Sequence, residues 1–273
     1  MKRKLLVAGP VALVVVIALV AFLAWPRGGT AVTEDEALDN FRSDQSASTT
    51  SDDAGSAEGT EGPSAVDTTP TPGVYSFATT GQESVKLGPL PAETRDYPDI
   101  VPVTITDGDQ EGCFKVKLDL LAEHSEDTTY CTTDDDGVRL AGHSKRQTVG
   151  PMKPVATMAC DEDVLIDPQA TGETALTCSL TIDGGPAELS ATVDGTVTAR
   201  TAVVDVDGRE VAAVQVDIVN TLSGDLTGTW NESLWFSEDD WLPLRIVRSL
   251  DMQGLAAFSE TSDLTITTLD PAT

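Results

Sequence analysis

Apolar and polar residues alternate with a period of two over much of the chain beyond residue 73. The alternation is clearest in four runs, residues 214–218, 230–236, 242–246 and 264–266. This period is typical of strands that bury one face, and turn-forming pairs such as Asp207-Gly208 separate the runs. No part of residues 73–273 carries a sustained apolar stripe of helical period. The pattern therefore predicts an all-β domain at 73–273, an antiparallel meander sheet that forms a curved half-barrel or a sandwich.

Residues 5–25 form an unbroken apolar run, LLVAGPVALVVVIALVAFLAW. A bilayer core needs about 20 helical residues, and this run supplies that length without one charge. Basic residues occupy positions 2–4 and only Arg27 follows closely, so the positive-inside rule places residues 1–4 in the cytoplasm. A cleaved secretory signal is the alternative, although its apolar core is normally about 7 to 15 residues long. We predict a single-pass transmembrane helix that anchors an extracellular C-terminal domain in the cell membrane.

The segment from residue 26 to residue 72 is rich in Ser, Thr, Ala, Gly and acidic residues. Between residues 30 and 72 the only aromatic residue is Phe41. Such a composition buries too little apolar surface to offset the entropy of ordering, so we predict a disordered acidic linker. A short helix from Glu34 to Phe41 is marginal at that length. As a flexible coil, the linker would hold the domain about 35 to 40 Å from the membrane.

Acidic residues dominate the charge of the chain. The 273 residues include 17 Lys+Arg and 45 Asp+Glu, which gives a formal net charge of -28. Such a surface repels phosphates and anionic lipid headgroups, so nucleic acid is not an expected partner. Cations, basic peptides and polycationic wall components are compatible with it. The simpler interpretation is that the acidic residues keep an exported domain soluble.

Four cysteines are the most specific signal inside the domain. Cys113 and Cys131 are separated by the same interval as Cys160 and Cys178. Turn-prone sequence lies midway in each interval, so each pair fits a hairpin whose two strands are joined by a disulfide. An even number of cysteines in an oxidising compartment favours disulfides, for which three pairings exist. From the hairpin geometry we predict the disulfides Cys113–Cys131 and Cys160–Cys178. The C-x-x-C spacing typical of zinc sites is absent from the sequence, so we expect these cysteines to be structural.

The sequence contains no motif with a catalytic context. It lacks G-x-S-x-G, H-E-x-x-H and a phosphate-binding glycine loop. Its two histidines are His124, at a predicted hairpin tip, and His143, which lies between Gly142 and Ser144. Residues 107–112, DGDQEG, match the start of a calcium loop, but a leucine occupies the position of the bidentate glutamate. We predict no catalytic residue, no metal and no cofactor, and hence a protein that is not an enzyme.

Three of the four tryptophans gather in residues 230–241. Trp230 and Phe236 share the face that is expected to build the core. Trp235 points to the opposite face and Trp241 lies in a predicted turn. Exposed aromatic residues are typical of binding sites, so Trp235 and Trp241 form a candidate binding patch, with coverage by a second layer as the alternative.

Residues 228–245, GTWNESLWFSEDDWLPLR, combine a strand that ends in an aromatic pair, an acidic turn and a Leu-Pro-Leu-Arg return strand. This stretch resembles the hairpins of lipoprotein-carrier (Lol-type) domains, and it is similar to membrane-anchored exported proteins of actinobacteria. The resemblance covers about one hairpin and implies a curved antiparallel half-barrel whose concave face holds acyl chains. The chain departs from that pattern because it has no lipidated cysteine and no evident amphipathic helices over the sheet.

Together these features predict a non-catalytic, membrane-anchored binding module of the cell envelope. Its expected partners are the membrane, through one helix, and a lipid, a wall polymer or an envelope protein. Two alternatives stay open, an exported hydrolase with a non-sequential active site and a passive accessory subunit of a membrane complex. A deep apolar groove would favour a carrier, a cleft joining a histidine to a serine would favour a hydrolase, and an exposed aromatic patch would favour a protein partner.

Overall fold

The fold is described from a computed structural model. It describes residues 29–49, 69–87, 91–133, 137–149, 151–160, 164–166, 172–185 and 187–273. Within these residues, no helix combines the length and the apolar character needed to cross a bilayer. The predicted membrane span, residues 5–25, lies outside the described residues.

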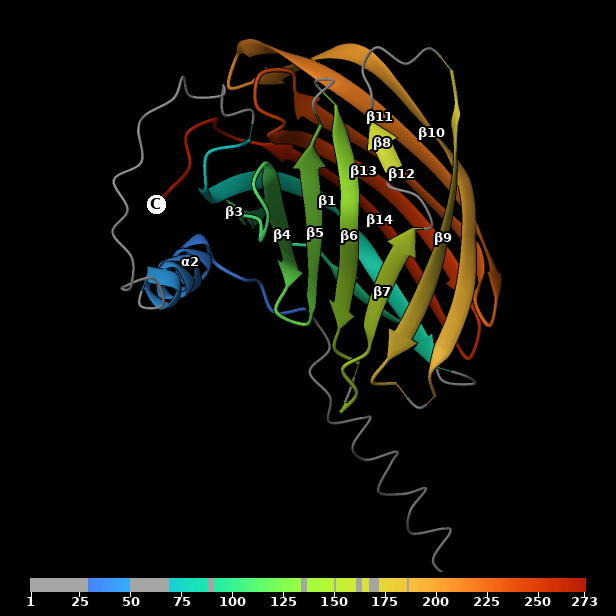
Figure 1. The fold of residues 1–273 in the computed structure, drawn as a ribbon. Helices are drawn as coiled ribbons and strands as arrows, with labels where there is room; N and C mark the ends of the chain where they lie inside the picture. The colour runs from blue at the N-terminus through green and yellow to red at the C-terminus, as the bar shows by residue number, and fades with distance from the viewer. Residues whose placement is uncertain are drawn as a thin grey trace, which may run out of the picture.

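Antiparallel strands make up almost all of the described regular structure, as predicted. They are β1 (Gly73–Leu87), β2 (Glu93–Asp96), β3 (Ile100–Asp107), β4 (Cys113–Leu121), β5 (His124–Thr132), β6 (Val138–Gln147), β7 (Val155–Cys160), β8 (Val164–Ile166), β9 (Thr174–Asp183), β10 (Leu189–Val206), β11 (Arg209–Gly224), β12 (Thr227–Ser237), β13 (Pro243–Gln253) and β14 (Ala256–Ile266). Twelve strands follow one another around a single sheet, while β2 adds to β1 and β8 adds to β6 (Figure 1).

The sheet closes on itself into a barrel, so the predicted half-barrel or sandwich is wrong. β1 pairs with β3 along one edge and with β14 along the other, which places Phe77 opposite both Val101 and Ile266. The β1–β14 register continues from there to Leu87 opposite Ala256. A twisted sheet of this many strands tends to curl, and closure pairs the backbone groups that two free edges would leave open. The alternating sequence pattern was consistent with an open sheet and with a closed barrel, because it shows which face of each strand is buried but not whether the first and last strands pair.

Successive hairpins place their turns alternately at the two ends of the barrel. The Glu123 end carries the β4–β5 turn and, by the same alternation, the turns β6–β7, β9–β10, β11–β12 and β13–β14. The opposite end, the Asp207 end, carries the β10–β11 turn. There Asp207 and Gly208 have φ values of 51° and 77°, the left-handed conformation that a two-residue hairpin turn requires.

The inward faces of the strands build the core. Phe77, Phe236, Leu244 and Leu264 are each 0 % exposed. A barrel of about eight strands is filled by its own side chains, whereas a wider barrel encloses additional space. The interior of this twelve-stranded barrel therefore has room for polar side chains and cavities, and the candidate site lies there.

Two disulfides join neighbouring strands, and their pairing confirms the prediction. Cys113 of β4 lies directly opposite Cys131 of β5, with Cα atoms 3.9 Å apart. Cys160 of β7 lies opposite Cys178 of β9, with Cα atoms 3.8 Å apart. Each disulfide therefore connects two strands that are already paired in the barrel.

Helix α2 (Glu34–Thr49) corrects the prediction of a disordered linker for these residues, whereas residues 26–28 and 50–68 of the predicted linker lie outside the described residues. Thr33 caps it, because its Oγ1 accepts a hydrogen bond from Glu36 N at 3.2 Å. Ala37 and Phe41, one helical turn apart, are buried against Val74 on the outside of the barrel. The composition of the segment was misleading because two apolar residues on one face of a helix are enough to hold it when the barrel provides a surface for them to pack on.

Candidate functional site

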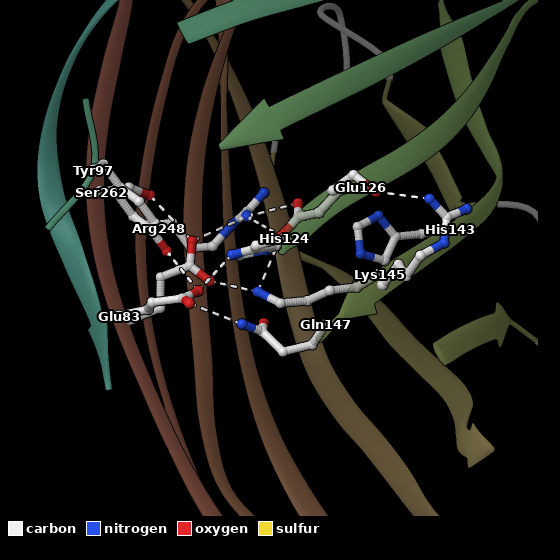
Figure 2. Close-up of polar contacts among 12 residues, drawn as sticks. Glu83, Tyr97, His124, Glu126, His143, Lys145, Gln147, Arg248 and Ser262 are labelled. Atoms are coloured by element: carbon white, nitrogen blue, oxygen red, sulfur yellow. Dashed lines mark hydrogen bonds and ion pairs between the residues drawn. The ribbon is translucent and has the colours of Figure 1, made fainter. Parts of the chain in front are cut away.

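A layer of charged side chains crosses the interior of the barrel. This charged layer consists of Glu83, Arg95, His124, Glu126, Lys145, Glu232, Arg248 and Glu260, all of which are buried except the half-buried Glu232. Its members occupy inward positions of the strands: Glu83 lies opposite Glu260, and Glu232 lies opposite Arg248. Figure 2 shows side chains from β5 and β6, in green, reaching toward the side chains on the opposite wall.

Arg248 binds three glutamates of the charged layer. Its Nη1 donates to Glu126 Oε2 at 2.7 Å, and its Nη2 donates to Glu232 Oε1 at 2.7 Å. Nη1 also lies 3.3 Å from Glu260 Oε1. Burial by itself raises the pKa of Glu126, but the charges of Arg248 and Lys145 outweigh burial and lower that pKa well below its ordinary value. Arg248 is therefore the principal counter-ion of the layer.

His124 lies between two carboxylates of the charged layer. Its Nδ1 is 2.6 Å from Glu83 Oε2 and its Nε2 is 2.9 Å from Glu126 Oε1. A neutral imidazole has only one N–H, so only the imidazolium can donate both hydrogen bonds. Burial and the Lys145 ammonium lower the pKa of His124, but its bonds to the two carboxylates outweigh them and raise the pKa above its ordinary value.

The charges of the layer balance when His124 is protonated. Four glutamates face three permanent cations, Arg95, Lys145 and Arg248, and the imidazolium supplies the fourth positive charge. Arg95 Nη1, for example, lies 3.2 Å from Glu83 Oε1. Buried charges are costly unless each is paired and hydrogen-bonded. The balance explains how an apolar barrel accommodates so many ionised groups.

A metal does not fit the charged layer well. His124, Glu126 and Glu260 place three potential ligand atoms within 4.8 Å of one another. However, Lys145 Nζ lies 3.0 Å from Glu126 Oε1, and Lys145 and Arg248 both contact Glu260. A metal ion at this point would be repelled by two fixed positive charges. The arrangement fits an internal ion-pair network better than a metal centre.

An apolar chamber of about 130 Å³, the Glu123-end chamber, lies between the charged layer and the Glu123 end of the barrel. Its walls include Val85, Met152, Ala156, Leu189, Met252 and Phe258. Its polar lining consists of Lys145 and Gln147. Lys145 Nζ lies 4.6 Å from the centre of the Phe258 ring, and Gln147 Nε2 donates to Glu83 Oε1 at 2.8 Å. The charged layer thus forms the inner end of this chamber.

A smaller, central chamber of about 60 Å³ lies on the other side of the charged layer, which contributes Glu126, Glu232 and Arg248 to its lining. His143 and Trp230 also line it, with ring centres 5.3 Å apart. Burial lowers the pKa of His143 to about 4, so its ring is neutral at physiological pH. His143 Nε2 and Trp230 Nε1 have no hydrogen-bond partner among the described residues. The central chamber is therefore more polar than the Glu123-end chamber.

The structure does not support the candidate patch of Trp235 and Trp241. Trp241 is 4 % exposed and its ring packs against Phe236, with centres 5.9 Å apart. Trp235 is half-buried on the outer face, where the Arg245 guanidinium lies 5.1 Å from its ring centre. The turn position of Trp241 was misleading because the side chain folds back from the turn onto Phe236 and is buried there. The two side chains do not form one exposed surface.

The two histidines and the calcium-like loop also have structural explanations. His124 begins β5 just after the predicted hairpin tip, but its side chain is fully buried in the barrel. His143 Nδ1 lies 2.9 Å from Thr128 Oγ1, and neither histidine has a hydrogen bond to a serine among the described residues. In the loop after β3, both carboxylate oxygens of Asp109 bind Lys115 Nζ at 2.9 Å. A polar turn accounts for that loop.

Sequence reasoning missed the charged layer, although one signal was present. Glu232 shares its face with Trp230, Leu234 and Phe236, so an alternating strand already placed a carboxylate among core residues. A buried carboxylate needs a cationic partner, and Arg248 stands at an equivalent inward position of the next strand. Glu83 carried no comparable signal, because its flanking residues Gln82 and Ser84 are polar as well.

The fold and the site define a class of protein: a closed, twelve-stranded antiparallel meander barrel with a charged interior layer and an apolar chamber at one end. No family model, curated protein or solved structure matches the chain. The resemblance of residues 228–245 to lipoprotein-carrier hairpins therefore stays a prediction.

Proposed function

We propose that this protein is a membrane-anchored binding module of the cell envelope that holds a small hydrophobic ligand in the Glu123-end chamber. The observation that carries this proposal is the apolar lining of a space of about 130 Å³. Apolar cavities of about 150 Å³ stay free of water and take up benzene. A chamber of similar size and lining favours a small aromatic ring or the end of an acyl chain.

The charged layer restricts which ligands the chamber accepts. Lys145 is already bound to Glu126 and Glu260, so an anionic ligand would compete with two carboxylates for it. Gln147 Oε1 is buried without a hydrogen-bond partner among the described residues, so it can accept one bond from a ligand that reaches it. We therefore expect a neutral ligand that is mostly apolar and carries at most one donor at its inner end.

Native mass spectrometry of residues 29–273 tests this proposal, because these residues include the complete barrel and helix α2. The protein would be secreted with a cleavable leader and purified oxidised and without detergent. We expect a reproducible added mass that solvent extraction identifies as a hydrophobic molecule. The variant Ala156→Phe fills the chamber from β7 and should lose this mass, because the ligand and the new ring compete for one volume.

Thr157→Phe is the matched control, because Thr157 is the next residue on the same strand and is exposed on the outer face. It should keep the added mass, and the unfolding temperatures of both variants show whether the fold is intact. A wild-type protein that is repeatedly bare would contradict the proposal. Equal ligand retention by the two folded variants would place any ligand outside the Glu123-end chamber.

A further inference from the structure

The first described residues of the chain are fastened to the Glu123 end of the barrel. Thr30 N donates to Glu123 Oε2 at 2.9 Å, and Thr30 Oγ1 donates to Glu123 Oε1 at 2.9 Å. The backbone repeats the contact, since Ala122 N donates to Thr30 O at 2.8 Å. Gly29 lies so close to Leu121 that a Cβ at Gly29 would stand 2.5 Å from that side chain. The chain therefore joins the barrel at the β4–β5 turn, where Figure 1 shows its blue start.

This attachment shortens the expected connection to the membrane. The apolar run predicted to span the bilayer ends at Trp25, five residues before Thr30. Five extended residues reach at most about 18 Å. A strand of 11 residues such as β14 is about 37 Å long, or about 28 Å along the axis of a barrel with ordinary strand tilt. The Glu123 end is thus held close to the bilayer, while the Asp207 end is separated from it by the height of the barrel.

The Glu123 end also presents apolar side chains to its surroundings. Leu255, in the β13–β14 turn, is 62 % exposed. Val149 and Met152 form a half-buried bridge in the β6–β7 loop, and both also line the Glu123-end chamber. Apolar residues exposed next to a chamber mouth are typical of surfaces that meet a membrane or a hydrophobic partner. Because the chain is strongly acidic, this contact would depend on apolar insertion and the anchor, not on charge.

We propose that the Glu123 end rests on the outer leaflet of the membrane and that the chamber takes up the apolar chain of a lipid directly from the bilayer. The second clause rests on the proposed function, whereas the first can be tested independently. The anchor, the attachment of Thr30, the exposed apolar rim and the chamber all lie at this one end. A ligand that enters here moves from one apolar environment into another, so it avoids the free-energy cost of crossing water.

Photocrosslinking of the full chain in lipid nanodiscs tests the orientation. The photoreactive residue p-benzoylphenylalanine would replace either Leu255 at the Glu123 end or Val203 near the Asp207 end. The two positions are matched, because both carry apolar side chains that are 62 % exposed. We expect several-fold more lipid adduct at position 255 than at position 203. Equal adduct formation at the two positions, whether strong or weak, would overturn the proposed orientation.

The variant Glu123→Ala tests the role of the Thr30 attachment. It removes both side-chain hydrogen bonds that fasten Thr30, so the barrel should tilt more freely and lipid adduct at position 255 should fall. Glu188→Ala is the control, because Glu188 is an exposed acidic residue at the same end. An unchanged adduct yield in Glu123→Ala would show that the attachment does not orient the barrel, and would overturn this part of the proposal.

The outcomes separate docking from ligand binding. Lipid adduct at position 255 together with a bare protein in native mass spectrometry would support docking and overturn uptake. A ligand that Ala156→Phe displaces, together with equal adducts at positions 255 and 203, would support the proposed function and overturn the membrane orientation. Both results in the expected direction would support uptake from the bilayer.

Discussion

Replacing Arg248 by methionine should destabilise the barrel strongly. The change removes the guanidinium that lies 2.7 Å from Glu126, 2.7 Å from Glu232 and 3.3 Å from Glu260. Methionine keeps most of the volume of the side chain, so the main effect is that carboxylates lose their counter-ion in a buried position. Removing one partner of a buried ion pair costs about 3 to 5 kcal/mol, because the remaining charge cannot be hydrated.

That cost is a large part of the total stability, since folded domains are stable by only about 5 to 15 kcal/mol. Urea unfolding of oxidised residues 29–273, followed by tryptophan fluorescence, measures it. With an m-value of about 2.5 kcal/mol/M, the expected loss corresponds to a midpoint lower by about 1 to 2 M. Adding Glu126→Gln to Arg248→Met should recover part of the loss, because it removes one of the stranded charges.

Arg245→Met is the matched control on the same strand. Arg245 points outward, and its pair with Asp263 at 2.7 Å is 40 % exposed on each side. Exposed ion pairs contribute about 0 to 1 kcal/mol, so this variant should unfold near the wild-type midpoint. If the two variants lost the same stability, the charged layer would not be the buried, mutually dependent network that its distances indicate.

Three further results are expected. The folded state raises the pKa of His124 above its ordinary value. The stability that the imidazolium contributes is therefore complete below about pH 6.5 and is lost as pH rises through the folded pKa. The urea midpoint of the wild type should fall on the alkaline side, and that of His124→Gln should fall less. The free energy of unfolding of the double variant Cys113→Ala/Cys131→Ala should be about 3 kcal/mol lower than that of the oxidised wild type. Urea unfolding measures this difference, with the reduced wild type as a second reference. Phe41→Ala should speed hydrogen exchange in helix α2, while the amides of the strands keep their protection. An equal loss of amide protection throughout the barrel would show that the helix does not pack as a separate unit.

The strands and disulfides were predictable because they depend on local patterns. Residues 214–218 alternate with a period of two, and Asp207-Gly208 forms the expected turn between β10 and β11. Equal spacing and turn-prone midpoints identified both cysteine pairs. Closure of the barrel was not predictable in this way, because no local pattern of β1 indicates that its second neighbour is β14. The sequence suggested only a marginal helix over residues 34–41, and its full length and stability were not predictable for the same reason, since the helix packs on Val74 of the barrel.

The charged layer was harder to predict than the fold. Its members come from seven different strands, and all except Glu232 are ordinary charged residues when read in their own segments. In a chain with 45 acidic residues, the four glutamates of the layer do not differ in type from the solvated ones. The register, which places Glu126 opposite Lys145 and Glu232 opposite Arg248, distinguishes them, and of the four only Glu232 also has a signal in its own strand. The same long-range geometry encloses the two chambers.

The pairing of β1 with β14 has a consequence for biogenesis. Phe77 and Ile266 are neighbours in the barrel although 188 residues separate them in the chain, so every intervening strand must be synthesised before the sheet can close. Contacts between such distant segments form slowly, because loop closure has to precede them. Until then the edges of β1 and β14 are open templates for other chains. The two disulfide-linked strand pairs, β4–β5 and β7–β9, join segments that are close in the chain and can form much earlier. An oxidised but open sheet is therefore the form in which this protein would depend most on chaperones.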